Sequence, residues 1–170
     1  MAGTWYVRPE ISGGGVVMDN GPHAIDLVRH LLGEIREFTA EATESQAYGV
    51  EDTGKLILRL EDGTLGTVDV SWAMAVPSRA YLEIFGEHGT LLADLEGVTY
   101  KYRTWKDWKR LPNRAGLEEA FARQIGHFLD VTRGQDPVVT SEDGMKAQIL
   151  INAACETIRR RARVPEAARV

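Results

Sequence analysis

The chain has 170 residues, of which 44% are hydrophobic and 26% are charged, as is ordinary for a soluble globular protein. Its formal net charge of −5 at pH 7 argues against nucleic acid as the main partner, because contacts to phosphates need a basic surface. The sequence has no run of about 20 apolar residues that would span a membrane, and its single cysteine, Cys155, cannot form a disulfide within the chain. We therefore expect one domain, residues 1–170, in the reducing environment of the cytoplasm.

The first predicted helix contains a proline. Residues 1–14 are expected to be an irregular lead-in, and residues 19–32 are predicted to form a helix because their apolar side chains recur at helical spacing. Gly33 suits the position just past the end of a helix. Because Pro22 cannot donate a backbone hydrogen bond, the regular helix is expected to begin near Asn20, or to kink there.

A region of strands follows, between residues 35 and 102, where apolar and polar side chains alternate in about six short runs. The turns between the runs are short, as in EDGT at 61–64, so consecutive strands are expected to be mainly antiparallel. Apolar side chains on both sides of the run 65–74 indicate that both faces of the sheet are covered there.

Two helices are predicted to close the chain, over residues 116–132 and from about residue 141 to residue 163. Thr140 or Ser141 is expected to cap the last helix, with Asp143 completing a variant of the capping box. This order of elements predicts an α+β fold, in which one mainly antiparallel open sheet has helices packed on one face.

Three glycines, Gly13, Gly14 and Gly15, precede the first predicted helix. They do not form a dinucleotide-binding fingerprint, because the spacing Gly-x-Gly-x-x-Gly would need a glycine where Met18 stands, and no parallel βαβ unit follows. Glycines at this place would still let a substrate or cofactor approach the backbone closely.

The same predicted helix carries Asp19, His23, Asp26 and His30, whose spacing places them within a sector of about 60°. One interpretation is a solvated polar face opposite the apolar face. Another is general acid–base chemistry, since a carboxylate one turn from a histidine can orient the imidazole and tune its pKa for taking a proton from a hydroxyl. Spacing leaves both open. No metal site is predicted, because one helix supplies too few ligands.

The segment GGGVVMDNGPHAIDLVRHLLGE, residues 13–34, closely resembles the signature of the glucose–fructose oxidoreductase, inositol dehydrogenase and rhizopine catabolism (Gfo/Idh/MocA) family. The pattern is Gly-Gly-x-x-x-Asp-x-Gly-x-His-x-x-Asp, followed by a leucine-rich helix and a glycine. The later segments VEDTGKLILRLEDGTLGTVDVSW, LEIFGEHGTL and EAFARQIGHFLDVTRGQDPVVTSEDG are similar to strands and helices of the same family. The resemblance extends over residues 5–163.

The resemblance implies the C-terminal domain of an NAD(P)-dependent oxidoreductase that acts on a sugar, polyol or similar hydroxy or keto substrate. In the family, an N-terminal Rossmann domain binds NAD(P), and the C-terminal α+β domain contacts substrate and often dimerises through its open sheet. This chain lacks the Rossmann domain and the Glu-Lys-Pro motif, so no cofactor is expected to bind it alone. The alternative is a non-catalytic dimerising or small-molecule-binding module.

Residue by residue, the resemblance matches His23 to the family's catalytic proton-transfer histidine. It matches Asp19 to the aspartate that positions the substrate or that histidine, and it implies that Asn20 belongs to the substrate site. Asp26 corresponds to a helix aspartate with a structural role. The implied partners are a small-molecule substrate and a second copy of the chain.

Overall fold

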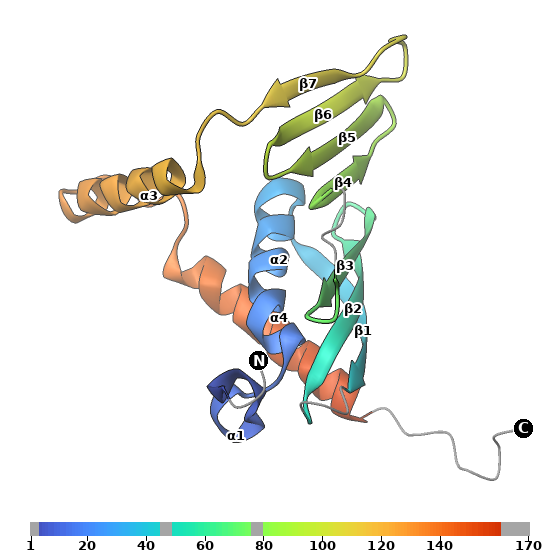
Figure 1. The fold of residues 1–170 in the computed structure, drawn as a ribbon, viewed down its shortest axis with the longest axis vertical. Coiled ribbons are helices and arrows are strands. Elements are labelled where there is room, and N and C mark those ends of the chain that lie inside the picture. The colour runs from blue at the N-terminus through green and yellow to red at the C-terminus, as the bar shows by residue number, and fades with distance from the viewer. Residues whose placement is uncertain (1–3, 45–48, 76–79, 161–170) are drawn as a thin grey trace, which may run out of the picture. The chain divides into compact units, whose positions relative to one another are not determined.

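The structure, a computed structural model, describes residues 4–44, 49–75 and 80–160 (Figure 1). The chain divides into two compact units, and each is described by itself. The first unit joins Met1–Met74 to Val139–Val170, and the second is Ala75–Val138.

The first unit is built on a three-stranded antiparallel sheet in the order β1-β2-β3. Its strands are β1 (Ile35–Glu44), β2 (Glu51–Leu60) and β3 (Leu65–Ser71). Along β2, the buried side chains of Leu56, Leu58 and Leu60 alternate with exposed ones, as the sequence predicted. One face of the sheet therefore lies in the core.

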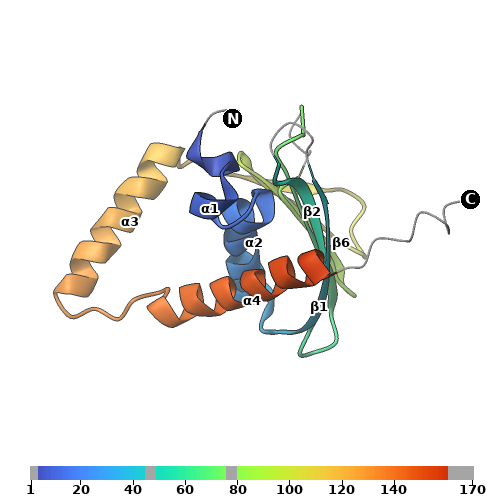
Figure 2. The same ribbon diagram turned by 90° about the horizontal axis from the view of Figure 1, so that it is seen from below.

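Two helices cover that face. They are α2 (Val16–Leu32) and α4 (Ser141–Arg160), which lie on the same side of β1 and β2 in Figure 2. Helices on one face of an antiparallel sheet confirm the predicted α+β class. The predicted capping box is also present, because the Thr140 backbone N–H donates to Asp143 Oδ2 at 2.9 Å and the Asp143 N–H donates to Thr140 Oγ1 at 3.3 Å.

The prediction that the first helix begins near Asn20 was wrong. The helix begins at Val16, so Pro22 lies in its interior, where the missing backbone N–H costs about 3 kcal/mol. Val16 and Val17 are both fully buried, and burying each side chain stabilises by roughly 1.5–3 kcal/mol. The core contacts of the first turn thus offset the proline. Before it, the expected irregular lead-in contains a 3-10 turn (Trp5–Val7) and a one-turn helix, α1 (Pro9–Ser12).

The face of the first sheet away from the helices is more polar than predicted. Val68 and Val70 of β3 are in the core, but Leu65 is 65% exposed, and Thr67 and Asp69 are exposed between them. The expectation that the run 65–74 is covered on both faces is therefore not met in this structure. Alternation along β3 sorts the apolar side chains onto one face, and Leu65 is the exception.

The second unit contains a separate four-stranded antiparallel sheet in the order β4-β5-β6-β7, followed by α3 (Leu117–Thr132). Its strands are β4 (Leu82–Phe85), β5 (Gly89–Asp94), β6 (Gly97–Tyr102) and β7 (Lys109–Pro112). The sequence predicted about six strands in one sheet, whereas the described residues form seven strands in two sheets. The unpredicted strand, β7, has the sequence KRLP, which is too short and too charged to show alternation.

Candidate functional site

Helix α2 packs against the core at two glycines where a Cβ atom would not fit. A Cβ atom on Gly54 of β2 would lie 2.3 Å from Val17 Cγ2, and one on Gly21 would lie 2.6 Å from Ile151 Cδ1 of α4. Only glycine permits such close approach of helix to strand and of helix to helix. These contacts fix the rotation of α2, so that its opposite face is directed to solvent.

The exposed face of α2 carries the predicted site residues. Asp19, Asn20, His23 and His30 are exposed, and Asp26 is half-buried. Within the described part of the chain, the Asp19 carboxylate and the His23 imidazole form no hydrogen bond or ion pair, with each other or with any other residue. The structure therefore leaves both groups free to meet a ligand. That Asp19 orients the His23 imidazole remains a prediction.

Asn20 is tied to the end of the first sheet. Its Oδ1 atom accepts a hydrogen bond of 3.3 Å from the indole Nε1 of Trp72, which directly follows β3. With Oδ1 engaged, the amide N–H groups of Asn20 have no partner among the described residues and can donate to a ligand. Nothing in the sequence indicates that Trp72 meets Asn20, which is 52 positions away. The one available hint is that a half-buried indole N–H needs an acceptor.

The glycine run before α2 is required by packing. Gly13 has a φ of +79° at the end of α1, which favours glycine. The Gly15 N–H donates to Glu51 Oε1 at 2.8 Å, and a Cβ on Gly15 would lie 1.9 Å from the backbone oxygen of Glu51. The close approach that glycine allows here is thus made by the start of β2.

The C-terminal end of α2 is fixed by a buried arginine. Arg29 donates from Nε and Nη2 to the carboxylate of Glu34, at 2.9 and 2.8 Å, and from Nη1 to the backbone oxygen of Asp143 at 3.0 Å. The hydrogen bond from Arg29 lowers the pKa of Glu34, and the same bond raises the pKa of Arg29, with the charges of Glu34, Asp143 and Asp26 adding to the effect. Asp26 contributes only its charge to this ion pair, so the structural hydrogen-bonding role that the resemblance implies for it stays a prediction.

A family model for the GFO/IDH/MocA C-terminal domain matches residues 1–92, more than half of the chain. The chain belongs to the GFO/IDH/MocA family. Myo-inositol 2-dehydrogenase of Thermotoga maritima is 27% identical over 165 residues, a match that covers 90% of this chain and 48% of that protein. The fold is shared with an NAD-binding oxidoreductase from Klebsiella pneumoniae, with a TM-score of 0.83 and 18% identity, covering 94% of this chain and 52% of that one. It is also shared with levoglucosan dehydrogenase in complex with NADH, with a TM-score of 0.82 and 16% identity, covering 92% and 51%.

Membership of the GFO/IDH/MocA family confirms the resemblance recognised in residues 13–34, which lie inside the matched region. The chain spans about half the length of the curated relatives it matches. The predicted site residues on α2 lie within residues 1–92, the region that the family model matches.

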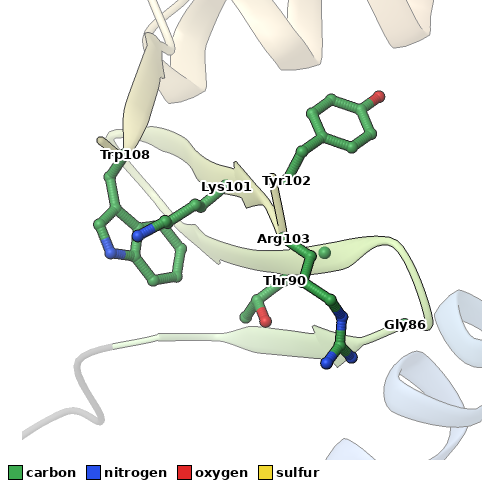
Figure 3. Close-up of a pocket in the computed structure, with 7 residues that line it drawn as sticks. Gly86, Thr90, Lys101, Tyr102, Arg103 and Trp108 are labelled. Carbon is green, nitrogen blue, oxygen red and sulfur yellow. The ribbon is translucent and has the colours of Figure 1, made fainter. Parts of the chain in front are cut away.

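A groove in the second unit has a volume of about 250 Å³, and none of its lining residues is a predicted site residue (Figure 3). Lys101, Trp108, Arg103 and Thr90 line it with their side chains. The remaining lining residues are Gly86, Gly89 and Tyr102. This groove was not predicted, because its residues become neighbours only through the pairing of β5 with β6 and the turn that follows β6.

The aromatic residues at the end of β6 pack on one another. The ring of Trp105 lies 4.7 Å from that of Tyr102 and 5.8 Å from that of Tyr100, and the Lys109 ammonium is 4.3 Å from its centre. The three rings therefore pack on one another within the β6–β7 hairpin.

Cys155 is buried in the core between α4 and the sheet, and burial raises the pKa of its thiol. It is therefore a packing residue and not an activated nucleophile. In residues 4–44, 49–75 and 80–160, no three metal-binding side chains come together. None of the helices in these ranges is long and apolar enough to cross a bilayer.

Proposed function

We propose that this chain is the substrate-binding and dimerisation domain of an NAD(P)-dependent oxidoreductase that acts on a sugar, a polyol or a similar hydroxy or keto compound. The observation that carries the proposal is the exposed face of α2, where Asp19, Asn20 and His23 stand unbonded or half-bonded on a rigidly packed helix. This face lies within the family-matched region, and the related proteins include inositol and levoglucosan dehydrogenases.

The chemistry of these three side chains suits an alcohol substrate. A carboxylate and an amide can hold neighbouring hydroxyl groups, with Asp19 accepting and Asn20 donating hydrogen bonds. The neutral His23 imidazole can take the proton of the reacting hydroxyl while that alcohol carbon is oxidised to a carbonyl. In the opposite direction, the imidazolium returns the proton to the carbonyl oxygen.

The glycine run before α2 does not fit the pyrophosphate group of a nicotinamide cofactor. Gly14 and Gly15 pack on Glu51, and the Gly15 N–H donates to the Glu51 carboxylate, so protein contacts occupy this part of the run where a pyrophosphate loop would need open space. The proposal therefore assigns cofactor binding, and acceptance of the hydride, to a separate nucleotide-binding half of about the same size. The alternative function, a binding module without turnover, is favoured by this lack of fit.

The open face of the β1–β3 sheet is proposed to carry a homodimer. Ile57 is 48% exposed and Leu65 is 65% exposed on this face, beside the ion pair of Lys55 Nζ with Asp69 Oδ1 at 2.6 Å. A symmetric contact would place both apolar side chains and both ion pairs in one interface of more than about 1,000 Å². Light scattering at high concentration should give twice the chain mass, and Ile57→Lys should return a monomer. We propose the reducing cytoplasm as the location of a protein with this function.

The functional proposal is tested by titrating the purified, isotope-labelled chain with sugars and polyols and recording backbone and imidazole NMR signals. We expect shifts confined to the Asp19–His23 turn and to the Trp72 indole. Turnover is then measured as NADH formation after addition of an NAD(P)-binding half. Shifts without turnover would select the binding module. No shift at the turn with any polyol would exclude this face as a substrate site.

A further inference from the structure

Helix α3 carries a stripe of large apolar side chains that are exposed among the described residues. The members are Leu117, Phe121, Ile125 and Phe128, spaced at i, i+4, i+8 and i+11, and we refer to them as the α3 stripe. Their exposed fractions are 72%, 56%, 61% and 64%. Taking about 200 Å² for a large apolar side chain, the stripe exposes roughly 500 Å², which is as large as the functional patches of typical monomers.

The opposite face of α3 carries charged side chains that are exposed to water and form ion pairs with one another. Arg123 pairs with Glu119 one turn earlier, and Asp130 pairs with Arg133 at 3.2 Å just past the helix end. On a flank of the helix, His127 Nε2 accepts a hydrogen bond of 3.2 Å from the Val138 N–H. Charges and the returning chain thus occupy the other sides of α3, and the stripe is the side left for a partner.

A helix in this situation needs a partner. An isolated helix of 16 residues is marginal in water, and most helical stability in proteins comes from packing of the apolar face. We propose that the α3 stripe is the docking surface for the nucleotide-binding half of the oxidoreductase. This inference rests on the proposed function, because it takes that half to exist.

Two observations favour this occupant over a second copy of the chain. The family relatives are about twice as long as this chain, and the matched family model is that of a C-terminal domain, so a segment of comparable size is available in the complete enzymes. The stripe and a partner surface of equal size would bury about 1,000 Å² in total, which lies within the ~600–1,500 Å² of contacts between domains of one protein. The same area falls short of the ~1,200–2,000 Å² of stable associations between separate proteins.

The test compares the chain alone with the chain mixed with an NAD(P)-binding half from the same genome. Hydrogen exchange of the α3 amides is expected to be fast in the chain alone and slowed at least tenfold in the mixture. Phe121→Ser and Phe128→Ser should each weaken association about tenfold or more, as expected for loss of a buried aromatic side chain. The matched control is Arg123→Gln on the charged face, which should leave the dissociation constant unchanged.

The outcomes separate the inference from the function on which it rests. Turnover in the mixture with unprotected α3 amides would overturn the docking role and leave the proposed function standing. Protection of α3 without turnover would do the reverse. Self-association of the chain that is abolished by Phe121→Ser and persists in the mixture would assign the stripe to a second copy. Equal effects of Phe121→Ser and Arg123→Gln would also overturn the docking role.

Discussion

Replacing Gly15 by alanine tests whether the glycine run serves packing or a ligand. The new Cβ would lie 1.9 Å from the backbone oxygen of Glu51, 2.9 Å from its carbonyl carbon and 3.0 Å from its nitrogen. Because all three are backbone atoms, no side-chain rotation can relieve the clash, and the first turn of α2 must move away from β2. Overpacking of this kind costs about 1–3 kcal/mol. Loss of the charged hydrogen bond from Gly15 to Glu51 adds about 1.5–3 kcal/mol.

We therefore expect Gly15→Ala to lower the free energy of unfolding by about 2.5–6 kcal/mol in urea titrations. The matched control is Gly126→Ala in α3, where a Cβ would meet nothing within 4 Å and alanine is the better helix former. That variant should unfold no more easily than the wild type. A Gly15→Ala protein that keeps its stability within about 0.5 kcal/mol but loses ligand binding would refute the packing explanation and return the glycine to a ligand site.

Three further predictions concern single groups. His23→Asn should lower kcat in the assembled enzyme by roughly 10²–10⁴-fold. Its melting temperature should not change, because the imidazole is exposed and unbonded among the described residues. Asp19→Asn should lower kcat by a smaller factor and shift the pH profile of kcat. The hydrogen bond from Arg29 lowers the pKa of Glu34, so this pair should stabilise the fold above the ordinary pKa of 4.5 and lose its effect as the pH falls below it. Urea unfolding at pH 7 and pH 3.5 should show a smaller acid-induced loss for Glu34→Gln than for the wild type. Burial raises the pKa of Cys155, so its labelling by a thiol reagent should be slow at pH 8 and become fast in urea.

The fold class was predictable because the strongest sequence signals are local. The alternation of Leu56, Leu58 and Leu60 specifies a half-buried strand, and EDGT specifies the turn into β3, where Gly63 has a φ of +89°. The division of the strands into two sheets was not predictable in this way. Which strands pair with each other depends on contacts between residues far apart in the sequence. Alternation indicates only which face of a strand is apolar.

The site was predictable only in part, for a similar reason. Helical spacing alone places Asp19 and His23 on one face of α2, and the family resemblance gives them roles. The start of the helix was missed because local rules weigh Pro22 against the helix and cannot count the burial of Val16 and Val17. The bond between Asn20 and Trp72 joins an N-terminal helix to the end of a strand and depends wholly on tertiary structure.

The two faces of α2 together support the proposed binding site over an ordinary solvated surface. A solvated face requires only polar side chains, and it tolerates small rotations and shifts of its helix. Here Val17 is seated on Gly54 and Gly21 on Ile151, so α2 can neither rotate nor move outward without losing core contacts. The same rigid helix presents Asp19 and His23 without partners among the described residues. A fixed backbone that carries an unbonded acid, an unbonded base and an amide with free N–H groups suits the recognition of a small polar molecule, because the cost of positioning those groups is met during folding and not during binding.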